Sequence, residues 1–232
     1  MTLKNKLLFL FQNFLISLNY IFFKNIDEIK LISENLNNND IIFDVGSNVG
    51  SFTHLVSKHN KDTYLSFHTF EPNKDINLKT KNLTNSKKHT IKHSKVAISL
   101  KLNKVKFYKN SISSQSSLKN ENNLIGKSIE TYEVKSISLD RYCEINNISH
   151  ISLLKIDVEG SELEVIMSGN KLIESGNVKL IKIEIQNNNL FQVFSLLNQN
   201  EYDLVGITNQ VYINNKLKLA DYYFINPNTS KY

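Results

Sequence analysis

One turn constrains the fold of this chain more than any other feature of its 232 residues. The run Asp44-Val45-Gly46-Ser47-Asn48-Val49-Gly50 follows a compact apolar stretch, Ile41 to Val45, and precedes a stretch that suits a helix, Phe52 to His59. Gly46 lets the chain turn tightly after a buried strand, and Gly50 permits close approach of backbone to a ligand or of helix to strand. The helix N-terminus offers N–H groups to a carboxylate. Asp44 is placed to accept from a ligand's ammonium group, directly or through water.

The glycine spacing also separates two classes of ligand. With Gly46 and Gly50, the turn lacks the G-x-G-x-x-G spacing that cradles a dinucleotide pyrophosphate. An NAD-dependent oxidoreductase is therefore the weaker interpretation, and a ligand without a pyrophosphate is favoured.

Short β-rich runs alternate with helical stretches along the chain, which is typical of βαβ units and a mainly parallel sheet. Ile91 to Ile98 is predicted as one strand, and Pro72 is expected to open a helix. Val105 to Tyr108 and Thr131 to Ile137 are predicted to form an antiparallel insertion around a Ser-rich loop, residues 111–117. The other predicted strands are Ile41–Val45, Tyr64–Phe70, Ile151–Ile156, Val178–Ile185, Tyr202–Ile207, Val211–Ile213 and Tyr222–Ile225.

These elements predict an α/β fold with a mainly parallel sheet of about seven strands flanked by helices. Residues 37–232 are expected to form this domain, and residues 1–36 an N-terminal helical segment. Within that segment Leu7 to Phe23 is apolar but interrupted by Gln12, Asn13, Ser17 and Asn19, so an amphipathic or core-capping helix is predicted. Weak peripheral association with a membrane surface is the alternative.

Composition limits the kinds of molecule that this chain is expected to bind and the compartment in which it is expected to work. The formal charge is +6, but Arg141 is the only arginine and the lysines are scattered, which argues against nucleic-acid binding. Cys143 is the only cysteine, so an intrachain disulfide is excluded and a cytoplasmic, reducing compartment is expected. The sequence assigns no oligomeric state.

Four further carboxylates fall at predicted strand ends. Glu71 ends the second strand, where an acidic side chain can accept from both hydroxyls of a ribose. Asp157 and Glu159 follow the strand Ile151–Ile156, at the edge where open α/β sheets bind ligands. Glu184 lies near the end of the next strand. A first-turn helix charge remains the simpler interpretation for Glu162.

Five segments of the sequence together resemble the FkbM family of methyltransferases over about Ile41 to Gln186. They are Phe43–Gly50, Phe70-Glu71-Pro72, Val96-Ala97-Ile98-Ser99, Ser138-Leu139-Asp140 and Leu154–Glu162, which reads LKIDVEGSE. The resemblance implies a Rossmann-like class I methyltransferase fold, S-adenosylmethionine as cofactor, and O-methylation of sugar hydroxyls on glycans or natural products. It does not identify the acceptor.

The resemblance also implies roles for single residues. The turn with Gly46, Ser47, Asn48 and Gly50 is assigned to the methionine moiety, and Glu71 to the ribose. Ala97 and Ser99 are assigned to the adenine, although Leu100-Lys101 stands where family members often carry an acidic residue. Asp157 and Glu159 are expected to face the methyl-transfer site, with Asp157 also beside the cofactor.

Methyl transfer to an alcohol benefits from a group that takes the acceptor's proton. Asp157, Glu159 and Glu184 are the candidates. Three carboxylates around one crevice could hold Mg²⁺, but no metal is assigned. A Gly46→Val substitution is expected to abolish cofactor binding and leave a folded protein. The alternatives are a methyltransferase acting on a small-molecule natural product, a non-catalytic cofactor-binding adapter and a membrane-surface assembly protein.

Overall fold

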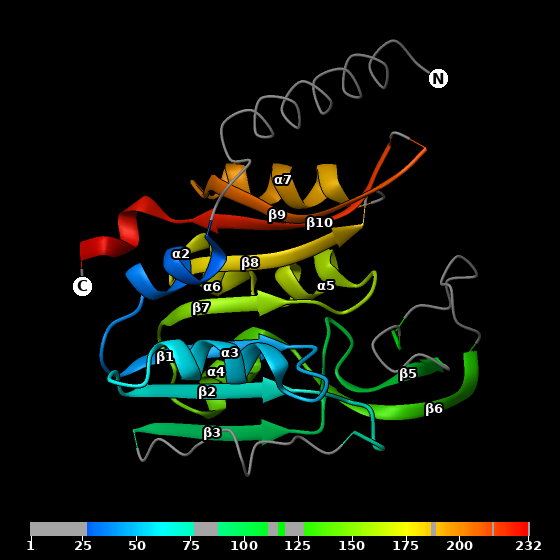
Figure 1. Ribbon diagram of the computed structural model, residues 1–232. Coiled ribbons are helices and arrows are strands. Elements are labelled where there is room, and N and C mark those ends of the chain that lie inside the picture. The colour runs from blue at the N-terminus through cyan, green and yellow to red at the C-terminus, as the bar shows by residue number, and fades with distance from the viewer. Residues whose placement is uncertain are drawn as a thin grey trace.

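The computed structural model describes residues 27–76, 88–110, 116–118, 128–186, 189–214 and 216–231. Its centre is a seven-stranded sheet with the order β3-β2-β1-β7-β8-β10-β9 (Figure 1). The first five of these strands are parallel, and β10 runs antiparallel to both β8 and β9. The strands are β1 Asp40–Val45, β2 Leu65–Phe70, β3 His89–Ser94, β7 Ile151–Ile156, β8 Val178–Gln186, β9 Asp203–Ile213 and β10 Lys216–Ile225. The predicted mainly parallel α/β fold is confirmed.

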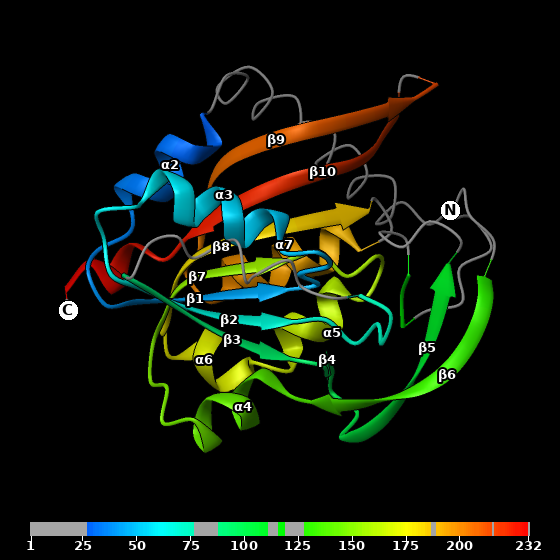
Figure 2. The same ribbon diagram turned by 60° about the horizontal axis from the view of Figure 1, so that its bottom comes forward.

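Helices cover both faces of this sheet, which explains why its central strands read as apolar runs. The helices are α2 Glu28–Glu34, α3 Ser51–His59, α4 Leu139–Ile145, α5 Glu162–Met167, α6 Asn170–Glu174 and α7 Leu190–Gln199. Figure 2 shows α2 and α3 on one face and α4 to α7 on the other. Every residue of β7 is buried, with Leu153 in the core under α2 and α3 and Leu154 in the core under the other helices.

The last part of the predicted N-terminal segment, residues 27–36, packs against the domain. Ile32 of α2 and the following Leu36 pack in the same core as Val56 of α3. Asp27 begins α2 by accepting a hydrogen bond from the Lys30 backbone N–H. Residues 27–36 therefore belong to the packed domain rather than to a separate N-terminal segment. Residues 1–26, with the apolar run Leu7 to Phe23, lie outside the described residues.

The predicted antiparallel insertion forms a second, three-stranded sheet, called here the insertion sheet. It has the order β4-β6-β5, with β4 Ala97–Ile98, β5 Asn103–Asn110 and β6 Ser128–Ile137. The prediction of one strand from Ile91 to Ile98 was wrong, because β3 ends at Ser94 and β4 pairs with β6. In Figure 2 the insertion sheet lies beyond the ends of β1 and β2 to which the arrowheads point.

Two other boundaries differ from the prediction. Tyr202–Ile207 and Val211–Ile213 belong to a single strand, β9, whose pairing with β10 contains register shifts. Pro72 does not open a helix: residues 72–76 form a turn, and residues 77–87 are not described. Among the helices that the structure describes, none is long and apolar enough to cross a membrane.

Candidate active site

A cavity of about 290 Å³ lies at the carboxyl ends of the parallel strands. The main sheet contributes Gly46 and Asn48 after β1, Glu71 after β2, Asp157 after β7 and Glu184 in β8. The insertion sheet and residues 116–118 close the side next to Glu71. Ligands of open α/β sheets bind at this edge, so the cavity is the candidate active site.

Gly46 brings two strand ends into contact. Its φ is +75°, and a Cβ added there would lie 1.8 Å from the backbone oxygen of Asp157. The backbone N–H groups of Gly46 and Ser47 donate to the Phe70 carbonyl, each at 3.0 Å. A valine at position 46 would therefore displace the end of β7 as well as any ligand. The structure therefore leads us to expect that Gly46→Val also disturbs the fold, whereas the sequence suggested that the variant would lose cofactor binding and stay folded.

Glu71 is held by two backbone donors. The Asn48 N–H donates to its Oε2 at 2.9 Å, and the Asn73 N–H donates to its Oε1 at 2.8 Å. The side chain is only 7% exposed, and this burial raises the pKa of Glu71 although both hydrogen bonds oppose the rise. The carboxylate therefore presents a fixed pair of acceptor oxygens to the cavity.

Lys155 is a buried residue at the site, and the sequence alone gave it no role. It lies in the buried strand β7, and its Nζ donates to the Gly46 carbonyl at 2.8 Å. The same Nζ lies 3.1 Å from Asp44 Oδ1 and 3.4 Å from Asp157 Oδ2. Burial alone would lower the pKa of Lys155, but the two carboxylates outweigh it and raise the pKa. Lys155 thus ties the Gly46 turn to the end of β7.

Asp44 lies behind the turn and not on the cavity wall. It is fully buried, and its Oδ2 accepts from the Thr53 hydroxyl at 2.8 Å while Oδ1 pairs with Lys155. This geometry does not favour a direct contact between Asp44 and a ligand's ammonium group, because both oxygens face other parts of the protein, and the contact through water stays a prediction. Asp44 instead anchors α3 and Lys155 to the end of β1.

Of the other predicted cofactor residues, some line the cavity and some do not. Ala97 lines the cavity with Gly46, Asn48, Glu71 and Asp157. Ser47 lines a neighbouring cavity of about 390 Å³ instead, and Gly50 is the N-cap of α3 with φ +86°.

Ser99 also lies away from the candidate active site. It is fully buried, its hydroxyl donates to Glu164 Oε1 at 2.6 Å, and it accepts from the Lys101 N–H at 3.1 Å. The predicted adenine contact by Ser99 is therefore not made from the cavity wall.

The three predicted catalytic carboxylates come together. Oxygen atoms of Asp157, Glu159 and Glu184 all lie within 4.8 Å of one another. Burial raises the pKa of Glu184 to about 8, and the charges of Asp157 and Glu159 add to the effect. The group can accept a proton near neutral pH, and its oxygens could also hold a hard cation such as Mg²⁺. The assignment of no metal stays a prediction.

Apolar side chains also line the cavity. They come from β2, from the segment between β3 and β4, from the insertion sheet and from residues 116–118: Phe70, Val96, Ile98, Phe107 and Leu118. Apolar and aromatic side chains with a few polar groups are typical of small-molecule sites. Phe107 and Leu118 were not predicted from the sequence, since alternation indicates a strand but not which face meets a ligand.

Comparisons with known proteins agree with this geometry. The model of the methyltransferase FkbM domain matches residues 44–222. Hexuronic acid methyltransferase AglP of Haloferax volcanii is 27% identical over 158 residues, which cover 68% of this chain and 61% of that protein. This chain therefore spans less than two thirds of that relative's length.

The fold is also found in a solved structure. The methyltransferase FkbM from Methylobacillus flagellatus KT superposes with a TM-score of 0.50 at 13% identity, covering 81% of this chain and 44% of that one. The predicted resemblance is confirmed by the family model, which covers the Gly46 turn, Glu71 and the carboxylates alike. The chain belongs to the FkbM family of methyltransferases.

Proposed function

We propose that the protein is an S-adenosylmethionine-dependent O-methyltransferase that acts on a sugar hydroxyl of a glycan or glycolipid precursor. One observation carries the proposal. A single cavity is lined by a fixed carboxylate, Glu71, by apolar side chains, and by the cluster of Asp157, Glu159 and Glu184. This arrangement combines groups suited to a nucleoside with groups suited to proton transfer.

The residues fit the cofactor. Gly46 lines the cavity without a side chain, so a ligand's methionine portion can lie directly against the backbone of the turn. Glu71 has acceptor capacity left for ribose hydroxyls, since each of its oxygens accepts one backbone N–H. Phe107 and Leu118 offer an apolar surface to an adenine. Bound there, S-adenosylmethionine supplies an electrophilic methyl group.

Glu184 is our candidate for the general base. Its pKa of about 8 makes it a stronger proton acceptor than an ordinary carboxylate, while it is still ionised in part at neutral pH. Asp157 is paired with Lys155 and is therefore better suited to positioning than to proton transfer. Glu159 is oriented by Gln186, whose Nε2 donates to its Oε2 at 3.3 Å. The acceptor hydroxyl would lose its proton to Glu184 as the oxygen takes the methyl group.

Two observations support a sugar acceptor. The AglP relative is named for hexuronic acid methylation. The neighbouring cavity shares Gly46, Asn48, Asp157 and Glu184 with the first, and it adds polar side chains such as Asn209 and Asp221. Polar side chains of this kind hydrogen-bond to hydroxyl-rich ligands.

Transfer of a labelled methyl group tests the proposal. The purified chain is incubated with methyl-labelled S-adenosylmethionine and two probes, an oligosaccharide containing hexuronic acid and a neutral oligosaccharide. We expect label in at least one saccharide, retained after mild alkaline hydrolysis because a methyl ether survives this treatment and a methyl ester does not, and far less label with Glu184→Gln. Intact cofactor binding with no label in either probe would favour the small-molecule or adapter alternatives.

A further inference from the structure

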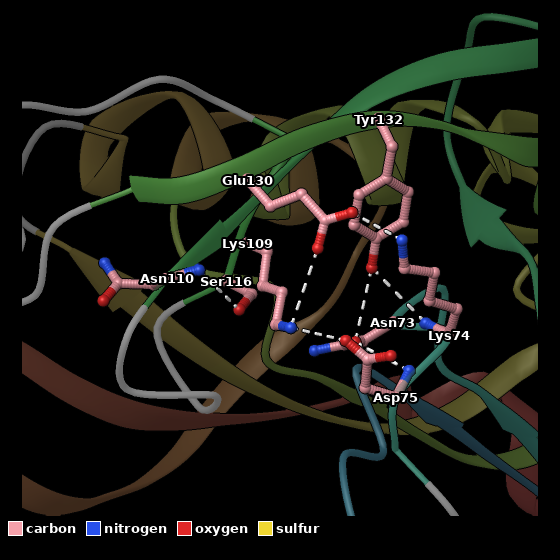
Figure 3. Close-up of polar contacts among 8 residues, drawn as sticks. All are labelled: Asn73, Lys74, Asp75, Lys109, Asn110, Ser116, Glu130 and Tyr132. Atoms are coloured by element: carbon pink, nitrogen blue, oxygen red, sulfur yellow. Dashed lines mark hydrogen bonds and ion pairs between the residues drawn. The ribbon is translucent and has the colours of Figure 1, made fainter.

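The insertion sheet is fastened to the loop after β2 by ion pairs beside the cavity (Figure 3). Lys74 of that loop pairs with Glu130 of β6 at 2.5 Å. Lys109 of β5 pairs with Asp75 of the loop at 2.5 Å and with Glu130 at 3.7 Å. Such partly exposed pairs contribute little stability each, so their main effect is to set how the loop lies against the insertion sheet.

Tyr132 lies inside this frame. Its ring packs against Phe107 with centroids 5.5 Å apart, and Lys74 Nζ lies 4.3 Å from its centroid. The Tyr132 hydroxyl donates to Asn73 Oδ1 at 3.3 Å and accepts from the Lys74 N–H at 3.4 Å. Burial raises the pKa of Tyr132, so the hydroxyl stays protonated and remains a donor at physiological pH.

Asn73 carries this contact to Glu71. It is only 1% exposed, and its Oδ1 also accepts from the Asp75 N–H at 3.1 Å, which shapes the turn. Its own backbone N–H donates to Glu71 Oε1. Asn73 therefore links Tyr132 on the insertion sheet, through its side-chain oxygen, to the carboxylate at the cavity wall, through its backbone N–H.

We infer that Asn73 and Tyr132 are positioning residues that orient the Glu71 carboxylate for the two ribose hydroxyls of the cofactor. The inference rests on the proposed function. The terminal torsion of a glutamate is soft, and the Asn48 N–H holds only one of the two oxygens. The bond from Asn73 fixes the other oxygen, and the Tyr132 hydroxyl fixes Asn73.

The test removes one oxygen atom. Tyr132→Phe keeps the ring against Phe107 and loses the hydrogen bond to Asn73. We expect its affinity for S-adenosylhomocysteine to fall about threefold to tenfold, the range for loss of one hydrogen bond. Its affinity for an analogue with hydrogen in place of both ribose hydroxyls should not change, because that ligand gives Glu71 nothing to hold. Tyr108→Phe is the matched control, since Tyr108 follows Phe107 on β5 and points to the opposite face.

Each outcome decides the inference. A loss confined to Tyr132→Phe and to the ligand with ribose hydroxyls supports it. An equal loss for both ligands would show a general structural effect and overturn it, as would an unchanged affinity for S-adenosylhomocysteine. Failure of the unaltered protein to bind S-adenosylhomocysteine would instead contradict the proposed function.

Discussion

The two sides of the cavity are built in different ways. On the side of β1, β7 and β8, polar side chains are buried and share one partner. Lys155 is 5% exposed, and its Nζ hydrogen-bonds to the Gly46 carbonyl and pairs with both Asp44 and Asp157. On the side of the insertion sheet, ion pairs such as Lys74–Glu130 leave both side chains partly exposed, and Lys104–Glu133, farther along the same sheet, is largely exposed. Changes on the first side should therefore threaten folding or chemistry, whereas changes on the second should adjust ligand binding.

The largest effect is expected at Lys155. Lys155→Met leaves two buried or half-buried carboxylates without their cation, which should lower the free energy of unfolding by about 3–5 kcal/mol. Lys104→Met on the insertion sheet breaks only an exposed pair and should cost about 1 kcal/mol or less. Denaturant unfolding of the two variants measures both, and similar losses would erase the contrast between the two sides.

Glu184→Gln should lower turnover by about a hundredfold or more, the usual effect of losing a general base. Its affinity for S-adenosylhomocysteine should stay the same, because the change lies at the acceptor end. Turnover of the unaltered protein should rise with pH through about 8, since the ionised form of Glu184 accepts the proton. A pH profile that is flat from 6 to 9 would remove Glu184 from this role.

The raised pKa of Glu184 also predicts that the free energy of unfolding changes with pH. The folded-state pKa of Glu184 is raised above its unfolded value, so the folded protein binds the extra proton. The stabilising contribution is complete below the unfolded pKa and is lost as pH rises through about 8. Glu184→Gln should therefore unfold with less pH dependence than the unaltered protein between pH 5 and 9, as thermal unfolding can show.

A substitution at Ser99 tests the contact between the segment that follows β4 of the insertion sheet and helix α5. Ser99→Ala breaks the hydrogen bond to Glu164 of α5 and should destabilise the fold by about 1–2 kcal/mol. The affinity for S-adenosylhomocysteine should not change, because Ser99 is not on the cavity wall. A weakened affinity at unchanged stability would restore the adenine contact that the sequence predicted.

The smallest effect is expected from chelation. If the carboxylates of Asp157, Glu159 and Glu184 act without a cation, activity should be the same with and without EDTA. Loss of activity in EDTA, restored by Mg²⁺, would show that the acidic side of the cavity holds a metal ion and would contradict the assignment of none.

The sequence predicted best where one local pattern determines structure. The apolar run Ile151–Ile156 and the turn at Gly46 predicted a strand and a strand–helix junction, and parallel order then brought Asp157 and Glu184 to one edge. Prediction from the sequence failed where the role of a residue depends on the direction in which its side chain points. The role of Lys155 depends on Asp44, which is distant in sequence, although a lysine in a buried apolar strand was a visible signal.

The insertion was predicted as an element but not as a wall of the site. Alternation across Val105–Tyr108 indicates a strand, yet only tertiary packing decides that Phe107 meets the cavity. Ser99 shows the same limit, because its partner Glu164 comes from a helix much later in the chain. The break after Ser94 was also hidden, since the sequence does not show that β4 pairs with β6.

The most direct test of the account is a calorimetric titration of the purified protein with S-adenosylhomocysteine, beside NADH and beside the Glu71→Gln variant. We predict binding of S-adenosylhomocysteine in the micromolar range, no binding of NADH, and a marked loss of affinity in Glu71→Gln, whose amide keeps the size of the side chain but not its two acceptor oxygens. Binding of NADH in preference, or no binding of S-adenosylhomocysteine by a folded sample, would contradict the assignment of this cavity to the methyl donor.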